Sequence, residues 1–445
     1  PDHGRPALPP PLSLSELRGR MAAFREGLAA GGHAVGAVYG DREHAANLHW
    51  LTGFDPRFEE ALLLVLPGEA HLLVGNECLP YAGLSPLAEA GEMAVHLVPS
   101  LSLTSQPRDG MTVPEAVRRL VPAGAAVGAV GWKVFEAAEG TTLALPAFLL
   151  DPLRDRAGRV EDATDLLMHP GHGLRSAVGA EEVARLEFAN AAAARALRRL
   201  IGALREGAVD FDVLEAAGLP GLPLAAHVTF ATGARAFQGL SSPTGQVVRR
   251  GVPISFNVAP WGANLCRAGW VAESEADLPA AAQGYLGDFV FPYAEAMSDW
   301  CGLMRPGVTG GAVWDRMAER LPFDLFGVAL NPGHLIGMDE WISSPVSRGS
   351  EVPLRSGMAM QMDVIPSHPA FGSTRIEDGY LVADEALRAD LAARFPEVEG
   401  RCAARAAVMR ERLGFEVPRT LLPLSDTCGL LAPFLLAPRR VVALG

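Results

Sequence analysis

Stretches of helical spacing alternate with short apolar runs along most of the chain. Leu17, Met21, Phe24 and Leu28 recur about one turn apart within residues 14–30, which predicts a helix with one buried face. Short buried strands are predicted at 34–39, 60–66, 70–74 and 126–131. Strands and helices alternate in this way to about residue 150, which indicates an α/β domain in the first part of the chain.

The remainder of the chain has its own pattern. Residues 151–173 are rich in turn-forming residues and mark the approach to a boundary. A long helix is predicted from Ala180 to about Arg205, and helices then alternate with Gly- and Pro-bounded strands to about residue 385. Two last helices are predicted at 385–394 and 397–413, before a Pro-rich tail. We therefore predict an N-terminal domain at 1–170 and a C-terminal domain at 171–445.

One stretch near the middle, residues 253–270, has two extended apolar arms around a turn-rich centre and predicts a β-hairpin. In a strand, residues two apart share a face. Ala268 therefore shares a face with Cys266 and Trp270, and Arg267 points to the other side. Asn257 lies on the first arm. The chemistry that this hairpin can support depends on the side chains at positions 257 and 268.

Composition limits the classes of function. Of the 445 residues, 49% are hydrophobic and 20% are charged, which is enough to bury a large core. The net charge of -13, without long runs of one sign, disfavours nucleic acid and anionic membranes as partners. No signal peptide is visible, and no apolar run reaches the ~18 residues of a membrane helix. The five cysteines are scattered and odd in number, so a reducing cytoplasm is predicted.

Several segments resemble motifs of aminopeptidase P, prolidase and creatinase, in the same order along the chain. Residues 47–54, Asn-Leu-His-Trp-Leu-Thr-Gly-Phe, resemble the N-x-x-Y-L-T-G-F segment of their N-terminal domain. Residues 176–187 resemble the helix that opens their C-terminal domain, and 333–337, 356–358 and 375–378 resemble three of its site motifs. The resemblance implies the pita-bread fold, an N-terminal creatinase-like α/β domain followed by a domain with a curved antiparallel sheet.

The peptidases of this family hold two divalent metal ions with five residues, and the resemblance assigns those positions here. His334 and Glu377 are kept, Asp363 stands where the family has Glu, and Asn257 and Ala268 replace the two hairpin aspartates. Two neighbouring cations need bridging carboxylates to offset their repulsion, so a two-metal centre is not expected. His334, Asp363 and Glu377 still offer one nitrogen and two carboxylates for a single ion.

Two family histidines that serve substrate binding and proton transfer are also replaced. Residues 231–243 contain no His, which argues against a creatinase-like mechanism, and Trp341 occupies the second position. The predicted catalytic residues are His334, Asp363 and Glu377, and the predicted substrate-binding residues are Asn257, Arg375, Trp341 and Trp270. One hypothesis is that an ion-pair cluster of the three catalytic residues, with or without Arg375, replaces the metals. The other is that these side chains are remnants satisfied by water.

Three functions are consistent with this pattern. The first is a hydrolase without a two-metal centre that acts on a C–N bond of a small amino-acid-like or peptide-like compound. The second is a non-catalytic ligand-binding or scaffold protein, and the third is a one-metal Xaa-Pro peptidase. The cofactor is accordingly none or a single divalent metal. We expect a small molecule or short peptide as the ligand, a homodimer, and a cytoplasmic location.

Overall fold

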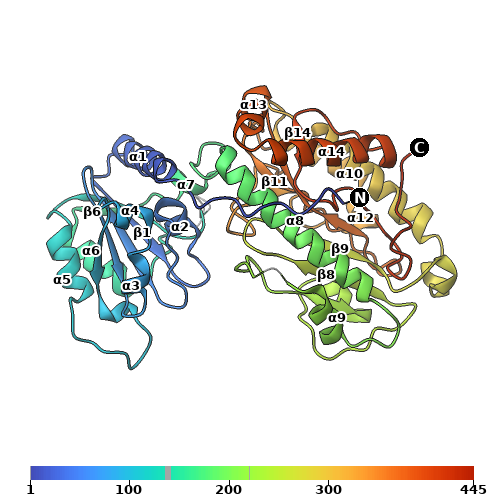
Figure 1. Cartoon of the computed structure of the whole chain (residues 1–445), viewed down its shortest axis with the longest axis horizontal. Helices are drawn as coiled ribbons and strands as arrows, with labels where there is room; N and C mark the ends of the chain where they lie inside the picture. The colour runs from blue at the N-terminus through green and yellow to red at the C-terminus, as the bar shows by residue number, and fades with distance from the viewer. Residues whose placement is uncertain (1, 136–141, 220) are drawn as a thin grey trace. The chain divides into compact units, whose positions relative to one another are not determined.

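The computed structural model describes residues 2–135, 142–219 and 221–445 (Figure 1). The chain forms two compact units. One contains residues Pro10–Ser176, and the other contains Ala177–Gly445 together with the residues that precede Pro10. The division therefore lies six residues beyond the predicted end of the first domain, and residues 2–9 pack with the C-terminal unit.

The N-terminal unit is built on one mixed sheet of six strands in the order β4-β3-β2-β1-β5-β6. Its strands are β1 (Val35–Gly40), β2 (Ala61–Val65), β3 (Ala70–Val74), β4 (Ala94–Leu97), β5 (Ala126–Val130) and β6 (Arg159–Asp162). Its helices are α1 (Leu14–Ala30), α2 (Ala46–Thr52), α3 (Cys78–Ala82), α4 (Pro86–Glu89), α5 (Val113–Leu120), α6 (Ala147–Arg156) and α7 (Asp165–Met168). Side chains of α5 and α6 share one apolar core with β1, β2 and β5, which makes this unit the predicted α/β domain.

The C-terminal unit has two four-stranded antiparallel sheets, with the orders β12-β9-β8-β7 and β10-β11-β13-β14. Their strands are β7 (Phe230–Thr232), β8 (Pro253–Val258), β9 (Leu265–Trp270), β10 (His334–Leu335), β11 (Ala359–Gln361), β12 (Arg375–Glu377), β13 (Gly379–Val382) and β14 (Leu421–Pro423). The single residue Asp378 separates β12 from β13, so the chain passes directly from one sheet into the other there. The predicted hairpin is confirmed as β8 and β9.

Helices pack on these sheets. They are α8 (Ala180–Ala203), α9 (Asp210–Ala217), α10 (Phe291–Leu303), α11 (Gly310–Arg320), α12 (Phe323–Phe326), α13 (Glu385–Arg394) and α14 (Pro396–Leu413). Figure 1 shows α8, in green, running beside β8 and β9, and its Leu197 and Leu200 share a core with Ile254 and Phe256. The long helix and the last two helices are thus confirmed, with ends within two residues of the prediction. None of the helices in the described ranges is long and apolar enough to span a bilayer.

Candidate functional site

The hairpin places the two exceptional positions on one face of the sheet. In the register of β8 and β9, Asn257 lies opposite Cys266 and Ser255 lies opposite Ala268. The amide oxygen of Asn257 accepts hydrogen bonds from the backbone N–H of Thr229 at 2.7 Å and from its hydroxyl at 3.2 Å. The oxygen of Asn257 is therefore already used by the protein, and Ala268 offers no polar atom.

Strand β12 brings two charged side chains beside this face. Arg375 lies opposite Ala268, and Glu377 lies opposite Cys266. Both side chains are buried. Burial opposes the charge of Arg375, but the neighbouring Cys266, Glu377 and Asp363 raise the pKa of its guanidinium. A buried cation therefore stands next to Ala268.

His334 is fixed by its backbone and by an aromatic neighbour. Gly333, before it, has φ of 124°, and a Cβ there would lie 3.0 Å from the carbonyl oxygen of Gln361. Glycine is required because the backbone approaches β11 closely at that point. The ring of His334 stacks on Trp341, with 4.1 Å between centroids and 19° between planes. Trp341, which stands where the resemblance would place a second histidine, thus packs on His334.

Two carboxylates flank the buried imidazole of His334. Its Nε2 lies 3.4 Å from Oε1 of Glu340 and 3.9 Å from Oδ2 of Asp363, and its Nδ1 lies 3.2 Å from the carbonyl oxygen of Leu335. Burial alone would raise the pKa of Glu340, but its contact with His334, the charge of that histidine and a hydrogen bond from Asn264 hold the pKa below its usual value. His334 and Glu340 are therefore suited to act as an ion pair.

An amide from the hairpin turn bridges two of the acids. Asn264 Nδ2 donates to Oε1 of Glu377 at 2.8 Å and to Oε1 of Glu340 at 3.2 Å. Gln361 Nε2 also donates to Glu377 Oε1, at 3.3 Å, and to the backbone oxygen of Asn264. No basic group lies within 4 Å of the Glu377 carboxylate in the described part of the chain. This differs from the hypothesis of an ion-pair cluster, because neutral amides hold Glu377 and the nearest acid to His334 is Glu340.

The two buried acids resist ionisation. Burial raises the pKa of Glu377 well above its usual value, and the nearby Asp363 and Glu340 raise it further. Burial likewise raises the pKa of Asp363, although His334 and Arg375 oppose the increase. Adjacent buried carboxyls tend to share a proton, and such a pair titrates as a unit.

These residues do not fit a pair of metal ions. Asn257 uses its oxygen within the protein, Ala268 has no ligand atom, and Asn264 directs an N–H at Glu377 where a cation would need the oxygen lone pair. Among the described residues, no group of three or more His, Cys, Asp or Glu side chains is arranged to hold a metal ion. We therefore derive no chemistry from a two-metal centre.

Four buried polar atoms around this network lack a well-formed hydrogen bond to any of the described residues. They are Nε2 of His334, Oε1 of Gln361, Oδ1 of Asp363 and Nε of Arg375. His334 and Gln361 are paired across β10 and β11, and Gln361 contacts Glu377 on β12. Buried polar groups are nearly always paired, so unpaired atoms gathered from three strands indicate a place for water or for a polar ligand.

Trp270 and Cys266, both considered in the sequence analysis, do not contribute reactive groups to this network. Trp270 donates through Nε1 to the carbonyl oxygen of Phe371 at 2.9 Å and packs edge-on against Tyr285 within an aromatic cluster. Burial raises the pKa of the Cys266 thiol to about 12, so it carries no thiolate at neutral pH. Burial therefore disfavours Cys266 as a nucleophile, and the indole N–H of Trp270 is used by the backbone of Phe371.

The residues predicted from sequence for the site did not include Asn264, Gln361 or Glu340. The available signal for Gln361 was its position two residues before Asp363, which places both side chains on one face of an extended segment. Asn264 gave no signal, because it stands at the end of a turn where side-chain direction depends on the turn geometry.

Comparison with known proteins defines the fold. No protein-family model matches the chain, and no curated protein sequence matches it. Solved structures do match, among them the prolidase from Pyrococcus horikoshii OT3, with a TM-score of 0.64, 17% identity, and coverage of 82% of this chain and 95% of the other. The dipeptidase PepE from Mycobacterium ulcerans has a TM-score of 0.63, 21% identity, and coverage of 85% and 95%. The chain has the pita-bread fold of the prolidases and Xaa-Pro peptidases.

The same fold occurs in a protein that is not named as a peptidase. The N-terminal domain of the FACT complex subunit SPT16 from Cicer arietinum matches with a TM-score of 0.56 and 14% identity, over 83% of this chain and 95% of that one. At these identities the likeness establishes the fold, and the function has to be argued from the site.

Proposed function

We propose that this protein is a hydrolase that cleaves a C–N bond in a small amino-acid-like or peptide-like compound without a pair of metal ions. The observation that supports this proposal most directly is the group of four buried polar atoms, Nε2 of His334 among them, that lack a well-formed hydrogen bond to the described residues. Asp363 and Gln361 offer acceptor oxygens to an ammonium or amide N–H, and Arg375 offers a donor to a carboxylate or carbonyl oxygen. This complement matches the two ends of an amino acid.

His334 is the group best placed to move a proton. In the hydrolysis we propose, its Nε2 takes a proton from the attacking water and returns it to the leaving nitrogen. Glu340, at 3.4 Å, stabilises the imidazolium that forms, and the stacked Trp341 holds the ring in place. The names of two structural neighbours, a prolidase and a dipeptidase, favour a short peptide as the first substrate to test.

The first prediction tests this role of His334. The protein, purified and assayed in EDTA, is expected to release product from Xaa-Pro dipeptides or N-substituted amino acids. His334→Gln should lower kcat by about 100-fold or more, because that is the usual contribution of a general acid–base group. The matched control is His227→Gln, since His227 is exposed and lies outside the network. Equal rates for the two variants would contradict the proposal.

A second function has its own support, which is ligand binding without turnover. Asn264 donates to both Glu340 and Glu377, so a neutral amide already occupies an oxygen of each of these two acids. If this is the function, amino-acid derivatives will raise the thermal midpoint of the protein while no product forms. Turnover that appears only when Mn²⁺ or Co²⁺ is added would instead favour the one-metal peptidase.

A further inference from the structure

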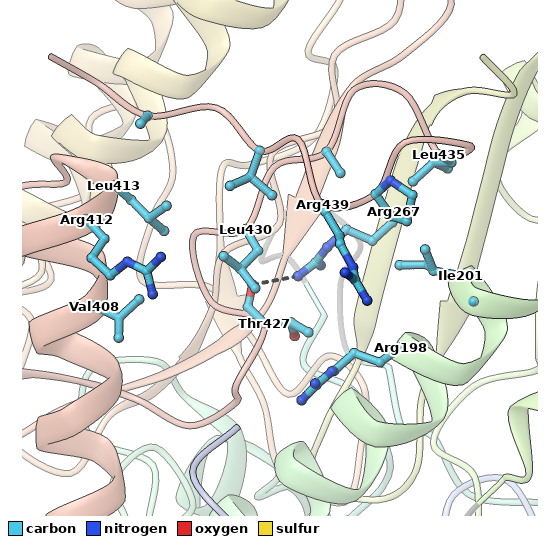
Figure 2. Close-up of a pocket in the computed structure, with 15 residues that line it drawn as sticks. Arg198, Ile201, Arg267, Val408, Arg412, Leu413, Thr427, Leu430, Leu435 and Arg439 are labelled. Carbon is cyan, nitrogen blue, oxygen red and sulfur yellow. Dashed lines mark hydrogen bonds between the residues drawn. The ribbon is translucent and has the colours of Figure 1, made fainter. Parts of the chain in front are cut away.

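A cavity of about 640 Å³ lies in the C-terminal unit (Figure 2). Its size is in the range of small-molecule sites, roughly 300–1,000 Å³. Helix α8 provides Arg198, strand β9 provides Arg267, helix α14 provides Arg412, and the tail provides Arg439. Figure 2 shows Arg412 on one side of the cavity, and Arg198, Arg267 and Arg439 together on the other. None of the described residues that line the cavity is Asp or Glu.

The arginines give the cavity a positive local charge, whereas the chain as a whole carries a net charge of -13. Gathered like charges repel one another, so a set without lining carboxylates attracts a counter-ion. Among the described residues, no carboxylate lies within ion-pair distance of Arg412 or Arg439, both of which are exposed. Arg198 contacts Asp2 at 3.9 Å through exposed side chains, a contact that solvent weakens.

Arg267 has a structural role, because its side chain forms a fixed part of the cavity wall. It is buried and pairs with Asp378 at 2.8 Å, and it also donates to the carbonyl oxygens of Thr427 at 2.9 Å and Glu377 at 3.1 Å. Asp378 therefore neutralises its charge. The attraction for an anion therefore comes from Arg412 and Arg439, and Arg267 forms a fixed part of the wall.

The remaining walls are apolar. Ile201 of α8, Leu413 of α14, and Leu430 and Leu435 of the tail all line the cavity. Such walls bind the hydrocarbon part of a ligand, while the guanidinium groups bind phosphate or carboxylate oxygens through paired N–H groups. We propose that this cavity binds a small organic anion that carries at least two negative charges, as phosphate or carboxylate groups, on an apolar body.

This site is separate from the one around His334. Arg267 stands between Cys266 and Ala268 on β9, and alternation along a strand sends its side chain to the other face of the sheet. The proposed anion site thus shares the strand with the first site but none of its side chains. The two proposals can therefore fail independently.

The test is calorimetric titration of the full chain at low ionic strength with pyrophosphate, citrate and phenyl phosphate. At least one should bind, and the preference between pyrophosphate and citrate identifies the charged group of the ligand. Phenyl phosphate should bind more tightly than inorganic phosphate titrated beside it, because the apolar walls contact its ring. Arg412→Gln with Arg439→Gln should weaken binding at least about tenfold, because two charged hydrogen-bond donors are lost.

The control is Arg249→Gln with Arg419→Gln, which removes the same charge from exposed positions of the same unit that do not line the cavity. This pair should leave the affinity within about twofold, as expected for screened surface charges. All four arginines are exposed, so both double variants should keep the thermal midpoint of the parent. Absence of binding by all three anions, or equal weakening in the two double variants, would overturn the proposal.

Discussion

At the scale of single residues, the site depends on how Glu377 is held. Its carboxyl accepts hydrogen bonds from the amides of Asn264 and Gln361 and lies near Asp363. Neutral donors satisfy a carboxyl in either protonation state, whereas a cation would favour the charged form. Burial and the nearby acids therefore favour the protonated form of Glu377, and this has a consequence for stability.

Glu377→Gln tests that consequence through pH. Burial raises the pKa of Glu377 in the folded protein above its value in the unfolded chain. As pH rises through the interval between the two values, the unfolded chain loses the proton first, so the stability of the parent protein falls. Gln does not titrate, so the variant should gain in thermal midpoint relative to the parent as pH is raised from 5 to 8, measured in EDTA. A tenfold difference between the two acid dissociation constants corresponds to about 1.4 kcal/mol of stability.

The control for this measurement is Glu385→Gln, which removes an exposed carboxylate paired with Arg419 at 3.0 Å. Its effect should be nearly the same at both pH values, because an exposed pair contributes little. A Glu377→Gln variant that loses stability relative to the parent on going from pH 5 to pH 8 would contradict the protonated network.

The unusual residues of the site could be identified from the sequence, but their hydrogen-bond partners could not. Strand alternation placed Asn257, Ala268 and Arg267 on their correct faces, because that period is a local property of the chain. The bridge from Asn264 to Glu340 and Glu377 joins a turn, a loop and a strand, separated by 76 and 113 residues. Contacts of that range depend on how three elements meet, and local patterns do not contain that information.

At the scale of elements, the two sheets of the C-terminal unit are connected where the chain passes from β12 to β13. Asp378 is fully buried there, and it accepts hydrogen bonds from the hydroxyls of Ser425 and Thr427, both at 2.9 Å, besides pairing with Arg267. One residue thus attaches both sheets to the segment that follows β14. The strand pattern predicts neither the switch between sheets nor its partner Arg267.

Asp378→Asn should therefore be strongly destabilising. The change keeps the shape of the side chain but leaves the buried guanidinium of Arg267 unpaired, which costs about 3–5 kcal/mol. For a unit of this size, the thermal midpoint should fall by roughly 6–20 °C. The matched control is Asp390→Asn, whose exposed contact with Arg394 is 3.4 Å long. A loss for Asp378→Asn no larger than that of the control would show that the junction tolerates an unpaired Arg267.

The helices were predicted closely from sequence for a physical reason. The predicted and observed ends of α1 and α13 coincide, and those of α8 and α14 differ by at most two residues. Long amphipathic periods and polar caps, such as Asp384 accepting from the N–H of Leu387, are local signals. The short strands β10 and β12 carry no comparable signal, because two or three residues are too few to show a period.

At the scale of the whole molecule, the N-terminal unit is an insertion in the chain of the other. Residues 10–176 have their own sheet and core, so they should fold when expressed alone. We expect a cooperative thermal transition and the far-ultraviolet circular dichroism of a mixed α/β domain. A non-cooperative melt would show that this unit needs the remainder of the chain. The homodimer and the cytoplasmic location stay predictions, which light scattering and fractionation can address.

The insertion also has a consequence for how the protein is made. The backbone N–H of His3 donates to Asp426 at 3.2 Å, across 423 residues of chain. At roughly 5–20 residues per second, a ribosome needs about 20–85 s to synthesise that interval, so residues 2–9 are made well before the segment that they contact. Its prolines, Pro6 and Pro9, remove backbone N–H groups that could pair with exposed strand edges in the meantime. Residues 2–9, with these prolines, are thus suited to a delay that the topology imposes.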